Sequence, residues 1–500
     1  MSKLQSLVKD TVIYGLSSII GRFLNYLLVP LYTAKMSVES GNYGVVTNMY
    51  AWTAILLVLL TFGFETTFFR FASKENSDVR RVFSMSMQVI GALCGVFLLA
   101  VFLFLPSVAD CLGYAATPEF IGMMAVVVAL DAMQSIPFGL LRFQKKPIKF
   151  AALKLLFIGM NITMNIFAFV ILPNLAKAYP ETFSRFYDPA NQAFYVFFIN
   201  LLCTSAITLF FIPELKMFRF TADKRLLKSM LEYSWPLLLL GIAGILNLHA
   251  DKIIYTWLVP GKQGMVELSI YGASVKVAAI MAMLMQAFRY AYEPFVFGNS
   301  KEKDSKELYA KAMKYFIIIA MMAFLVVMFY MDILKYIISP AYWEGLNVVP
   351  VVMAAEIFMG IYFNLSFWYK LNDETYWGAI FSFIGCAILF AVNIMFVPVY
   401  GYIACAWASF AGYFTAMLLS YIIGQKRNAI SYDLKSILAY TALFAVLYGI
   451  SVANPIENSI LRMACNTVLL IVFVAYFIKK DLPLKNIPVI GKFFRISMYR

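Results

Sequence analysis

The chain has 500 residues, of which 62% are hydrophobic and only 14% are charged. A soluble domain is about half apolar and about a quarter charged, so these proportions exclude an ordinary water-soluble protein and predict an integral membrane protein. The net charge of +14 would suit a nucleic-acid partner, but basic residues also accumulate in the cytoplasmic loops of membrane proteins.

Apolar stretches near the ~20 residues that span a bilayer as a helix recur along the whole chain, and alternating strand patterns are absent. The sequence therefore predicts an all-α polytopic membrane protein with about fourteen transmembrane helices. In chain order they are Thr11–Thr33, Tyr43–Phe69, Val82–Leu105, Ile121–Leu141, Ala151–Leu172, Ala193–Ile212, Ser234–Val259, Ile270–Phe297, Tyr315–Met331, Val348–Trp368, Ala379–Val397, Tyr402–Ile423, Ile437–Val452 and Ile460–Ile478. The first lacks a small-residue cleavage site, which predicts an uncleaved helix.

Basic residues divide unequally between the two sides of this topology. With both termini and every even-numbered loop on the cytoplasmic side, 31 of the 41 Lys and Arg residues fall on that side, five on the other and five within helices. This asymmetry predicts an even number of helices with both ends cytoplasmic, in a bacterial inner membrane. It also explains the net charge without a nucleic-acid partner.

One pattern recurs at an offset of 228 residues. Tyr43-Gly44 matches Tyr271-Gly272, and Phe64-Glu65 matches Tyr292-Glu293. The offset contains six predicted helices, so it predicts two pseudo-symmetric six-helix bundles of parallel orientation around a central cavity. The expected divisions are an N-terminal bundle over 1–215, a cytoplasmic linker over 216–229, a C-terminal bundle over 230–430, two further helices over 431–480 and a basic cytoplasmic tail over 481–500.

Motifs for catalysis and for cofactors are missing. The chain has one histidine, His249, and no Gly-rich phosphate loop of the Walker type, so a Ser-His-Asp triad, a His-rich metal site and direct ATP hydrolysis are not expected. The six cysteines have neither metal-ligand nor redox spacing. We therefore expect no enzyme activity, no cofactor and no metal site.

Charged residues inside apolar helices are the functional candidates, since such residues are costly and usually face a cavity or a partner. Cations suited to an anionic substrate are Arg22, Lys252, Lys276 and Arg289. Candidates for ion coupling, or for structural ion pairs, are Glu65, Asp131, His249, Asp251, Glu293 and Glu356.

A structural role remains open for several of these candidates. Arg22 could pair with Asp131 or Glu65, and Arg289 could pair with Glu293 four residues later on the same helix. Asp251 and Lys252 point about 100° apart on a helix, so we expect each to need a partner elsewhere or an aqueous cavity.

Several short motifs resemble the multidrug/oligosaccharidyl-lipid/polysaccharide (MOP) exporter superfamily, in its O-antigen and capsule flippase branch. They are Gly21-Arg22-Phe23-Leu24, Pro30-Leu31-Tyr32-Thr33, Tyr43-Gly44, Ala250-Asp251-Lys252, Tyr271-Gly272 and Tyr292-Glu293-Pro294-Phe295. The resemblance covers essentially the full chain. One departure is that the first helix carries Arg22 and no identifiable acidic cation site, as drug-exporting members have.

The resemblance implies a flippase that moves an undecaprenyl-diphosphate-linked oligosaccharide from the cytoplasmic to the periplasmic leaflet. An H+ or Na+ gradient or the membrane potential would drive it, and a polysaccharide polymerase is a candidate partner. Three alternatives stay open: a multidrug/cation antiporter, a lipid II flippase, and, less favoured, a membrane-embedded polymerase or ligase. The longest predicted outer loop, 173–191, lacks the histidine expected of the last class.

Overall fold

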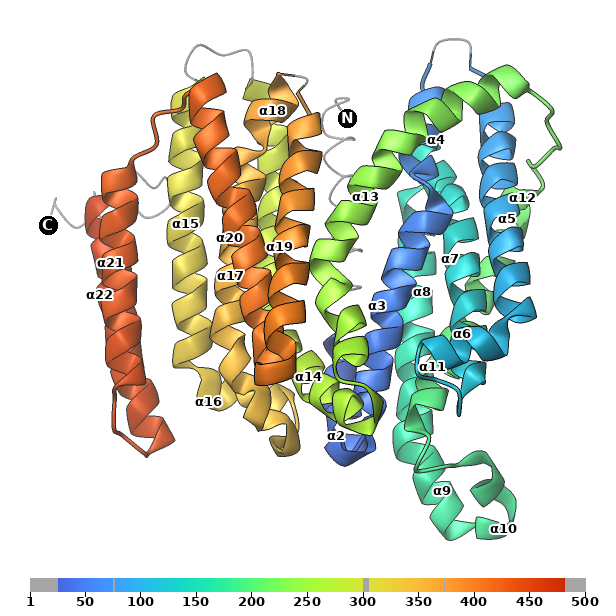
Figure 1. Cartoon of the computed structure of the whole chain (residues 1–500), viewed down its shortest axis with the longest axis horizontal. Helices are drawn as coiled ribbons and strands as arrows, with labels where there is room; N and C mark the ends of the chain where they lie inside the picture. Colours follow the sequence, from blue (N-terminus) through green and yellow to red (C-terminus); the bar gives the residue numbers. More distant parts are fainter. Residues whose placement is uncertain (1–25, 75–76, 300–304, 373, 482–500) are drawn as a thin grey trace, which may run out of the picture. The chain divides into compact units, whose positions relative to one another are not determined.

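The computed structural model describes residues 26–74, 77–299, 305–372 and 374–481 (Figure 1). Within these ranges the regular elements are helices, and thirteen helical stretches are long and apolar enough to cross a membrane. The prediction of an all-α, multi-pass membrane protein is confirmed. Of the predicted first helix, only the end is described, as α2 (Leu28–Lys35).

The remaining helices follow in chain order. They are α3 (Asn42–Thr61), α4 (Phe64–Ala72), α5 (Val79–Leu103), α6 (Leu105–Cys111), α7 (Pro118–Phe143), α8 (Pro147–Ile166), α9 (Leu172–Ala178), α10 (Pro180–Phe183), α11 (Gln192–Leu209), α12 (Ile212–Leu215), α13 (Lys224–Leu258), α14 (Gly261–Asn299), α15 (Ser305–Phe329), α16 (Met331–Leu334), α17 (Val349–Leu365), α18 (Phe367–Leu371), α19 (Tyr376–Tyr400), α20 (Tyr402–Arg427), α21 (Leu434–Val452) and α22 (Ser459–Lys480). Short 3₁₀ turns (Val38–Ser40, Ser184–Phe186, Lys335–Ile337 and Pro340–Val348) and a π-helical turn (Phe167–Ile171) join some of them.

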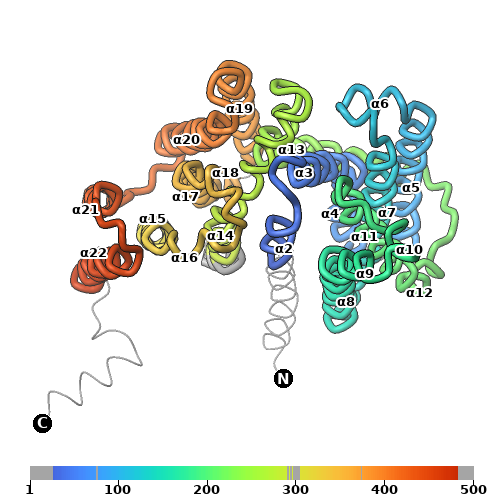
Figure 2. Tube along the Cα trace, turned by 90° about the horizontal axis from the view of Figure 1, so that it is seen from below, coloured from blue at the N-terminus to red at the C-terminus, as the bar shows by residue number. Residues whose placement is uncertain are grey.

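The chain folds as two compact units. The first unit comprises residues 1–276, 338–348 and 376–412, and the second comprises residues 277–337, 349–375 and 413–500. In the first, α7 packs between α5 and α11, and α13 packs on both α3 and α19 (Figure 2). In the second, α15 packs on α17, α21 and α22. The division into two six-helix bundles remains a prediction.

The predicted second helix is broken in the structure. Phe62 and Gly63 both adopt left-handed backbone, with φ of 50° and 71°, which ends α3 and starts α4. Gly63 tolerates this conformation because it has no Cβ. The break places Glu65 in the first turn of a separate helix.

Helix α13 begins at Lys224, ahead of the predicted start at Ser234. The Asp223 carboxylate accepts the backbone N–H groups of Arg225 and Leu226, both at 3.0 Å, and so caps the helix. It also pairs with Arg81 at 2.7 Å. The basic segment read as a linker is therefore partly the first turns of a long helix.

Ion pairs fix the last helices within the second unit. Arg462 of α22 binds both carboxylate oxygens of Asp332: its Nη2 donates to Oδ1 at 2.6 Å and its Nε donates to Oδ2 at 2.8 Å. Lys335 contacts the same carboxylate at 3.2 Å. Burial of Asp332 opposes ionisation, but the hydrogen bonds from Arg462 and Lys335 outweigh it and lower the pKa of Asp332 below its usual value.

We predict that Arg462→Met lowers the melting temperature most at neutral pH. A carboxyl with a lowered folded-state pKa contributes stability above its unfolded pKa of about 3.9 and loses it as pH falls through the folded pKa. The gap between wild type and variant should therefore narrow between pH 7 and pH 3 in differential scanning fluorimetry. Lys311→Met is the control, because its pair with Glu307 is exposed on both sides and such pairs contribute little. A gap independent of pH would contradict the assignment.

Candidate functional site

The two Tyr-Gly pairs of the sequence repeat meet in the first unit. The backbone N–H of Gly44 in α3 donates to Ser269 Oγ of α14 at 2.7 Å. A Cβ on Gly44 would lie 2.0 Å from the backbone oxygen of Met265, so only glycine permits this approach. The sequence singled out the Tyr-Gly pairs without indicating that they bring two helices together.

Gly272 of α14 lies at the same helix crossing, against α3. A Cβ there would lie 2.5 Å from Thr47 Oγ1 of α3. The tyrosines beside the glycines are buried: the Tyr43 ring packs on Tyr342 with centroids 6.0 Å apart, and Tyr271 turns toward α13. The crossing therefore fixes α14 against α3 and sets the position of Tyr271.

Asp251 and Lys252 of α13 form a pair with each other. Lys252 Nζ lies 2.9 and 3.0 Å from the two carboxylate oxygens of Asp251, and the Tyr271 hydroxyl donates to Asp251 Oδ2 at 2.6 Å. The expectation that adjacent residues would need partners elsewhere is wrong for this pair. The helix separates their Cβ atoms, but the long lysine stem folds back to reach the neighbouring carboxylate.

Polar contacts join this pair to α3. The Lys252 backbone oxygen accepts from Asn48 Nδ2 at 2.8 Å, and Asn48 Oδ1 accepts from the Tyr114 hydroxyl at 2.8 Å. Asn48 is fully buried. A buried, satisfied polar network of this kind orients its members and rigidifies them.

His249 and Lys276 complete this group. Asp251, Lys252 and Lys276 all lie within electrostatic range of His249. The side chain of Lys276 is exposed within the apolar middle of α14, and no described residue makes a hydrogen bond or ion pair with it. The structure thus brings four candidates together, and Lys276 adds a cation beyond the Asp251–Lys252 pair.

Glu65 and Asp131 lie in a second group of charges, in α4, α7 and α8. Glu65 pairs with Arg142, and the Asp131 carboxylate is within hydrogen-bonding reach of Thr204. Lys154 of α8 is an electrostatic neighbour of all three charged residues and lies 4.0 Å from the centre of the Phe138 ring.

Lys154 and Arg142 are residues that the sequence analysis missed as site candidates. Both were counted among the cytoplasmic basic residues: Arg142 in the basic loop after the predicted fourth helix, and Lys154 at the cytoplasmic start of the predicted fifth helix. The presence of two acidic residues within apolar helices, Glu65 and Asp131, was the signal that basic partners were nearby.

The other candidates lie apart from these groups along the chain. Arg22 lies outside the described residues, as does the side chain of Glu293, so their predicted pairings stay predictions. In the second unit, the Arg289 guanidinium stacks 4.4 Å from the centre of the Phe363 ring. Glu356 of α17 is half-buried and has a bonding partner.

A family comparison matches more than half of the chain. Residues 7–296 match the model of a family described as polysaccharide biosynthesis protein. No curated protein matches the chain by sequence.

Solved transporters share the fold. A lipid II flippase, MurJ, in an inward closed conformation aligns with a TM-score of 0.70 and 12% identity over 94% of this chain and 99% of that chain. Multidrug resistance transporters of the MATE family, in the MOP superfamily, align in an inward-facing form (TM-score 0.59, 13% identity, 83% and 94% coverage) and in an outward-facing form (0.55, 13%, 85% and 98%). At these identities the likeness shows a common fold, that of MOP superfamily transporters.

Proposed function

The chain belongs to the family of polysaccharide biosynthesis proteins, and from that premise we propose that it is a flippase that moves a lipid-linked oligosaccharide across the membrane. The substrate would be a glycan on undecaprenyl diphosphate, as an O-antigen, capsule or exopolysaccharide unit. The chain would work by alternating access and would move the substrate rather than change it chemically.

The observation that carries this proposal is the uncompensated cation of Lys276. Asp251 and Lys252 balance one another at 2.9 Å, so the exposed Lys276 ammonium leaves its group net positive. An intramembrane charge of this kind marks a substrate or ion pathway by default. A diphosphate headgroup is anionic, so Lys252 and Lys276 would attract it. Arg22 and Arg289 would attract the headgroup at other points of its transport.

The proposed setting is a bacterial inner membrane with both termini in the cytoplasm. The distribution of 31 basic residues on one side against five on the other supports this orientation. The substrate would then enter from the cytoplasmic leaflet and leave in the periplasmic leaflet, where a polysaccharide polymerase would receive it.

An H+ or Na+ gradient is the proposed energy source. The carboxylates that the sequence singled out in the first unit are Glu65, Asp131 and Asp251, with His249 beside the last. Glu65 is paired with Arg142 and Asp251 with Lys252, so pairing alone does not separate these two carboxylates, and Asp131 and His249 stay candidates for coupling beside them.

A lipid II flippase is the second candidate, favoured by the likeness to MurJ across nearly all of both chains. Its substrate is also a diphosphate lipid, so the charge of the site does not separate the two. Deletion separates them: loss of a lipid II flippase stops growth, whereas loss of a surface-polysaccharide flippase removes surface glycan from viable cells.

Complementation of a deletion strain tests the role of Lys276. We predict that wild type and Lys276→Arg restore surface glycan, whereas Lys276→Ala reduces it about tenfold, the effect of losing one charge-assisted contact of about 1.5 kcal/mol. The lipid-linked intermediate should accumulate in the cytoplasmic leaflet. Lys311→Ala, at an exposed pair, is the control for expression and charge.

Two outcomes would overturn the proposal. Unchanged glycan with increased sensitivity to cationic drugs in the deletion strain would replace the flippase by a cation antiporter. Full rescue by Lys276→Ala and by Arg22→Ala at normal expression would remove the cationic site on which the proposal rests.

A further inference from the structure

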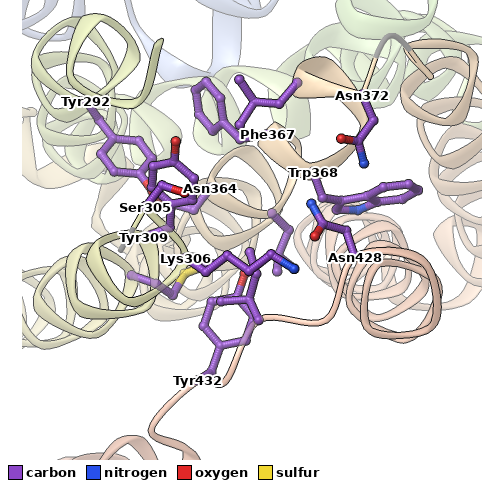
Figure 3. Close-up of a pocket in the computed structure, with 14 residues that line it drawn as sticks. Tyr292, Ser305, Lys306, Tyr309, Asn364, Phe367, Trp368, Asn372, Asn428 and Tyr432 are labelled. Carbon is purple, nitrogen blue, oxygen red and sulfur yellow. The ribbon is translucent and has the colours of Figure 1, made fainter. Parts of the chain in front are cut away.

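One cavity lies entirely within the second unit, and none of the charged residues of the first unit lines it. It has a volume of about 430 Å³, within the range of small-molecule sites, and 14 residues line it (Figure 3). They come from the end of α14, the start of α15, the end of α17 with α18, and the segment that follows α20. In the proposed orientation these ends face the cytoplasm.

The lining of this cavity is rich in neutral hydrogen-bonding groups. The carboxamides of Asn372 and Asn428 lie beside Trp368 (Figure 3), and neither has a side-chain hydrogen-bond partner among the described residues. The Tyr432 hydroxyl and the Ser305 hydroxyl also belong to the lining. Such groups offer both donors and acceptors, as a ligand with several hydroxyl groups requires.

A buried acceptor at the wall of the cavity lacks a partner. Asn364 is 5% exposed, and its Nδ2 donates to the Gly360 backbone oxygen at 2.9 Å, but its Oδ1 is buried without a hydrogen bond. A buried polar atom in this state destabilises the fold, because it has lost its hydrogen bonds to water and has gained none within the protein. A hydroxyl that entered the cavity would supply the missing donor and recover part of the lost stability.

An aromatic wall completes the cavity. The Trp368 indole N–H lies 3.4 Å from Ser420 Oγ, and a Cβ on Gly424 would lie 2.8 Å from two atoms of the indole, so α20 backs the ring closely. Phe367 and Tyr292 also line the cavity and pack against each other with centroids 5.4 Å apart. Rings held in place from behind present a fixed apolar wall to a ligand at little entropic cost.

The charge of the residues that line the cavity restricts the ligands that it can bind. Among the described residues that line the cavity, Lys306 is the charged one; it is exposed, and its Nζ donates to the Ala429 backbone oxygen at 3.1 Å. One lysine suits a neutral ligand or one with a single negative charge, but a diphosphate is better served by several cations or by arginine.

We propose that this cavity binds a sugar: one or two pyranose rings, neutral or with a single acidic group. The asparagine carboxamides bond to its hydroxyl groups, the Trp368 wall packs against its apolar ring face, and Lys306 meets an acidic substituent. This site is distinct from the diphosphate site proposed above, and its test does not depend on transport. The sugar could be the glycan end of a lipid-linked substrate or a free cytoplasmic saccharide.

Saturation-transfer NMR on the full chain in phosphatidylcholine nanodiscs, which contain no sugar, tests the proposal. The probes are glucose, N-acetylglucosamine and glucuronate, with inorganic phosphate as the comparison. We expect saturation of the sugar ring protons in wild type. Asn364→Leu and Asn372→Ala should each weaken binding about tenfold, as loss of one hydrogen bond of about 1.4 kcal/mol does.

Asn393→Leu is the matched control. Asn393 of α19 is also buried, also donates its Nδ2 to the backbone oxygen four residues earlier at 2.9 Å, and also has an unpartnered Oδ1, but it does not line this cavity. The Asn393→Leu variant should bind sugar as the wild type does. Asn372 is exposed, so its variant tests the site even where Asn364→Leu fails to fold.

The experiment distinguishes failure of the sugar site from failure of the flippase proposal. No transfer to any sugar, equal transfer in all variants, or binding of phosphate without sugar would each overturn the sugar site while leaving the flippase proposal intact. If free sugar inhibits transport in the wild type but not in Asn372→Ala, the glycan end of the substrate occupies the cavity. Binding that leaves transport unchanged assigns the cavity to a free saccharide; both of these results support the site.

Discussion

Gly44→Ala is expected to destabilise the protein by about 3 kcal/mol or more, the upper range for overpacking where a backbone must move. The new methyl group would lie 2.0 Å from the backbone oxygen of Met265 and 2.9 Å from its carbon, and neither atom can rotate away. The melting temperature and the folded yield after size-exclusion chromatography in detergent should both fall.

Two further glycines make this expectation specific. Gly95→Ala in α5 should be neutral or stabilising, because nothing lies within 4 Å of its Cβ position and alanine favours a helix by roughly 0.5–1 kcal/mol over glycine. Gly272→Ala meets the Thr47 side chain instead of backbone, so Thr47→Ala should rescue it. Thr47→Ala should not rescue Gly44→Ala. Equal stability of Gly44→Ala and Gly95→Ala would contradict the close crossing of α3 and α14.

Asp251→Asn is expected to cost about 3–5 kcal/mol of stability, the loss typical when one partner of a buried ion pair is removed. The Lys252 side chain is only 14% exposed and would lose its counter-ion. Asparagine preserves the size of the side chain and an acceptor for Tyr271, so the change isolates the charge. Thermal unfolding and transport should be measured on the same preparation.

The double variant Asp251→Asn/Lys252→Met separates a structural role from coupling. It removes both charges and should recover most of the stability that the single variant loses. If transport and its pH dependence return as well, the pair is structural and Asp251 does not couple transport to an ion. If stability returns while transport stays absent, the charge of Asp251 takes part in the transport cycle.

The class of the helices and thirteen of the fourteen predicted spans could be predicted from the sequence, because apolar runs of spanning length are a property of each segment alone. Most of the first predicted span lies outside the described residues. The repeat could be found in the same way, because Tyr43-Gly44 and Tyr271-Gly272 can be recognised by comparing the sequence with itself. Their meeting in space was not predictable. Nothing in a local pattern states that Gly44 will lie against Met265.

The errors at the site also have a physical cause. Counting charges by side assigned Lys154 to the cytoplasmic start of its predicted helix, which gave no sign that it lies close to Asp131. The helical angle between Asp251 and Lys252 described their backbone positions correctly but ignored the reach of a four-carbon side chain. Pairs such as Arg142 with Glu65 depend on tertiary contact, and only the presence of acids in apolar helices hinted at them.

No pattern in the sequence indicated the cavity in the second unit. Asn364, Asn372 and Asn428 are separated along the chain and are ordinary residues for helix ends and turns, so each alone indicates only a boundary. Their chemistry becomes specific when three helix ends bring them to one wall with Trp368 and Lys306.

The bond between Gly44 and Ser269 also bears on how the protein is made. Its two residues are 225 positions apart, and a ribosome adds about 5–20 residues per second, so roughly 10–45 s separate their synthesis. Throughout that interval α3 is present without α14, the helix that Gly44 contacts. The first unit also includes residues 338–348 and 376–412, so its assembly cannot be completed until the ribosome has passed residue 412.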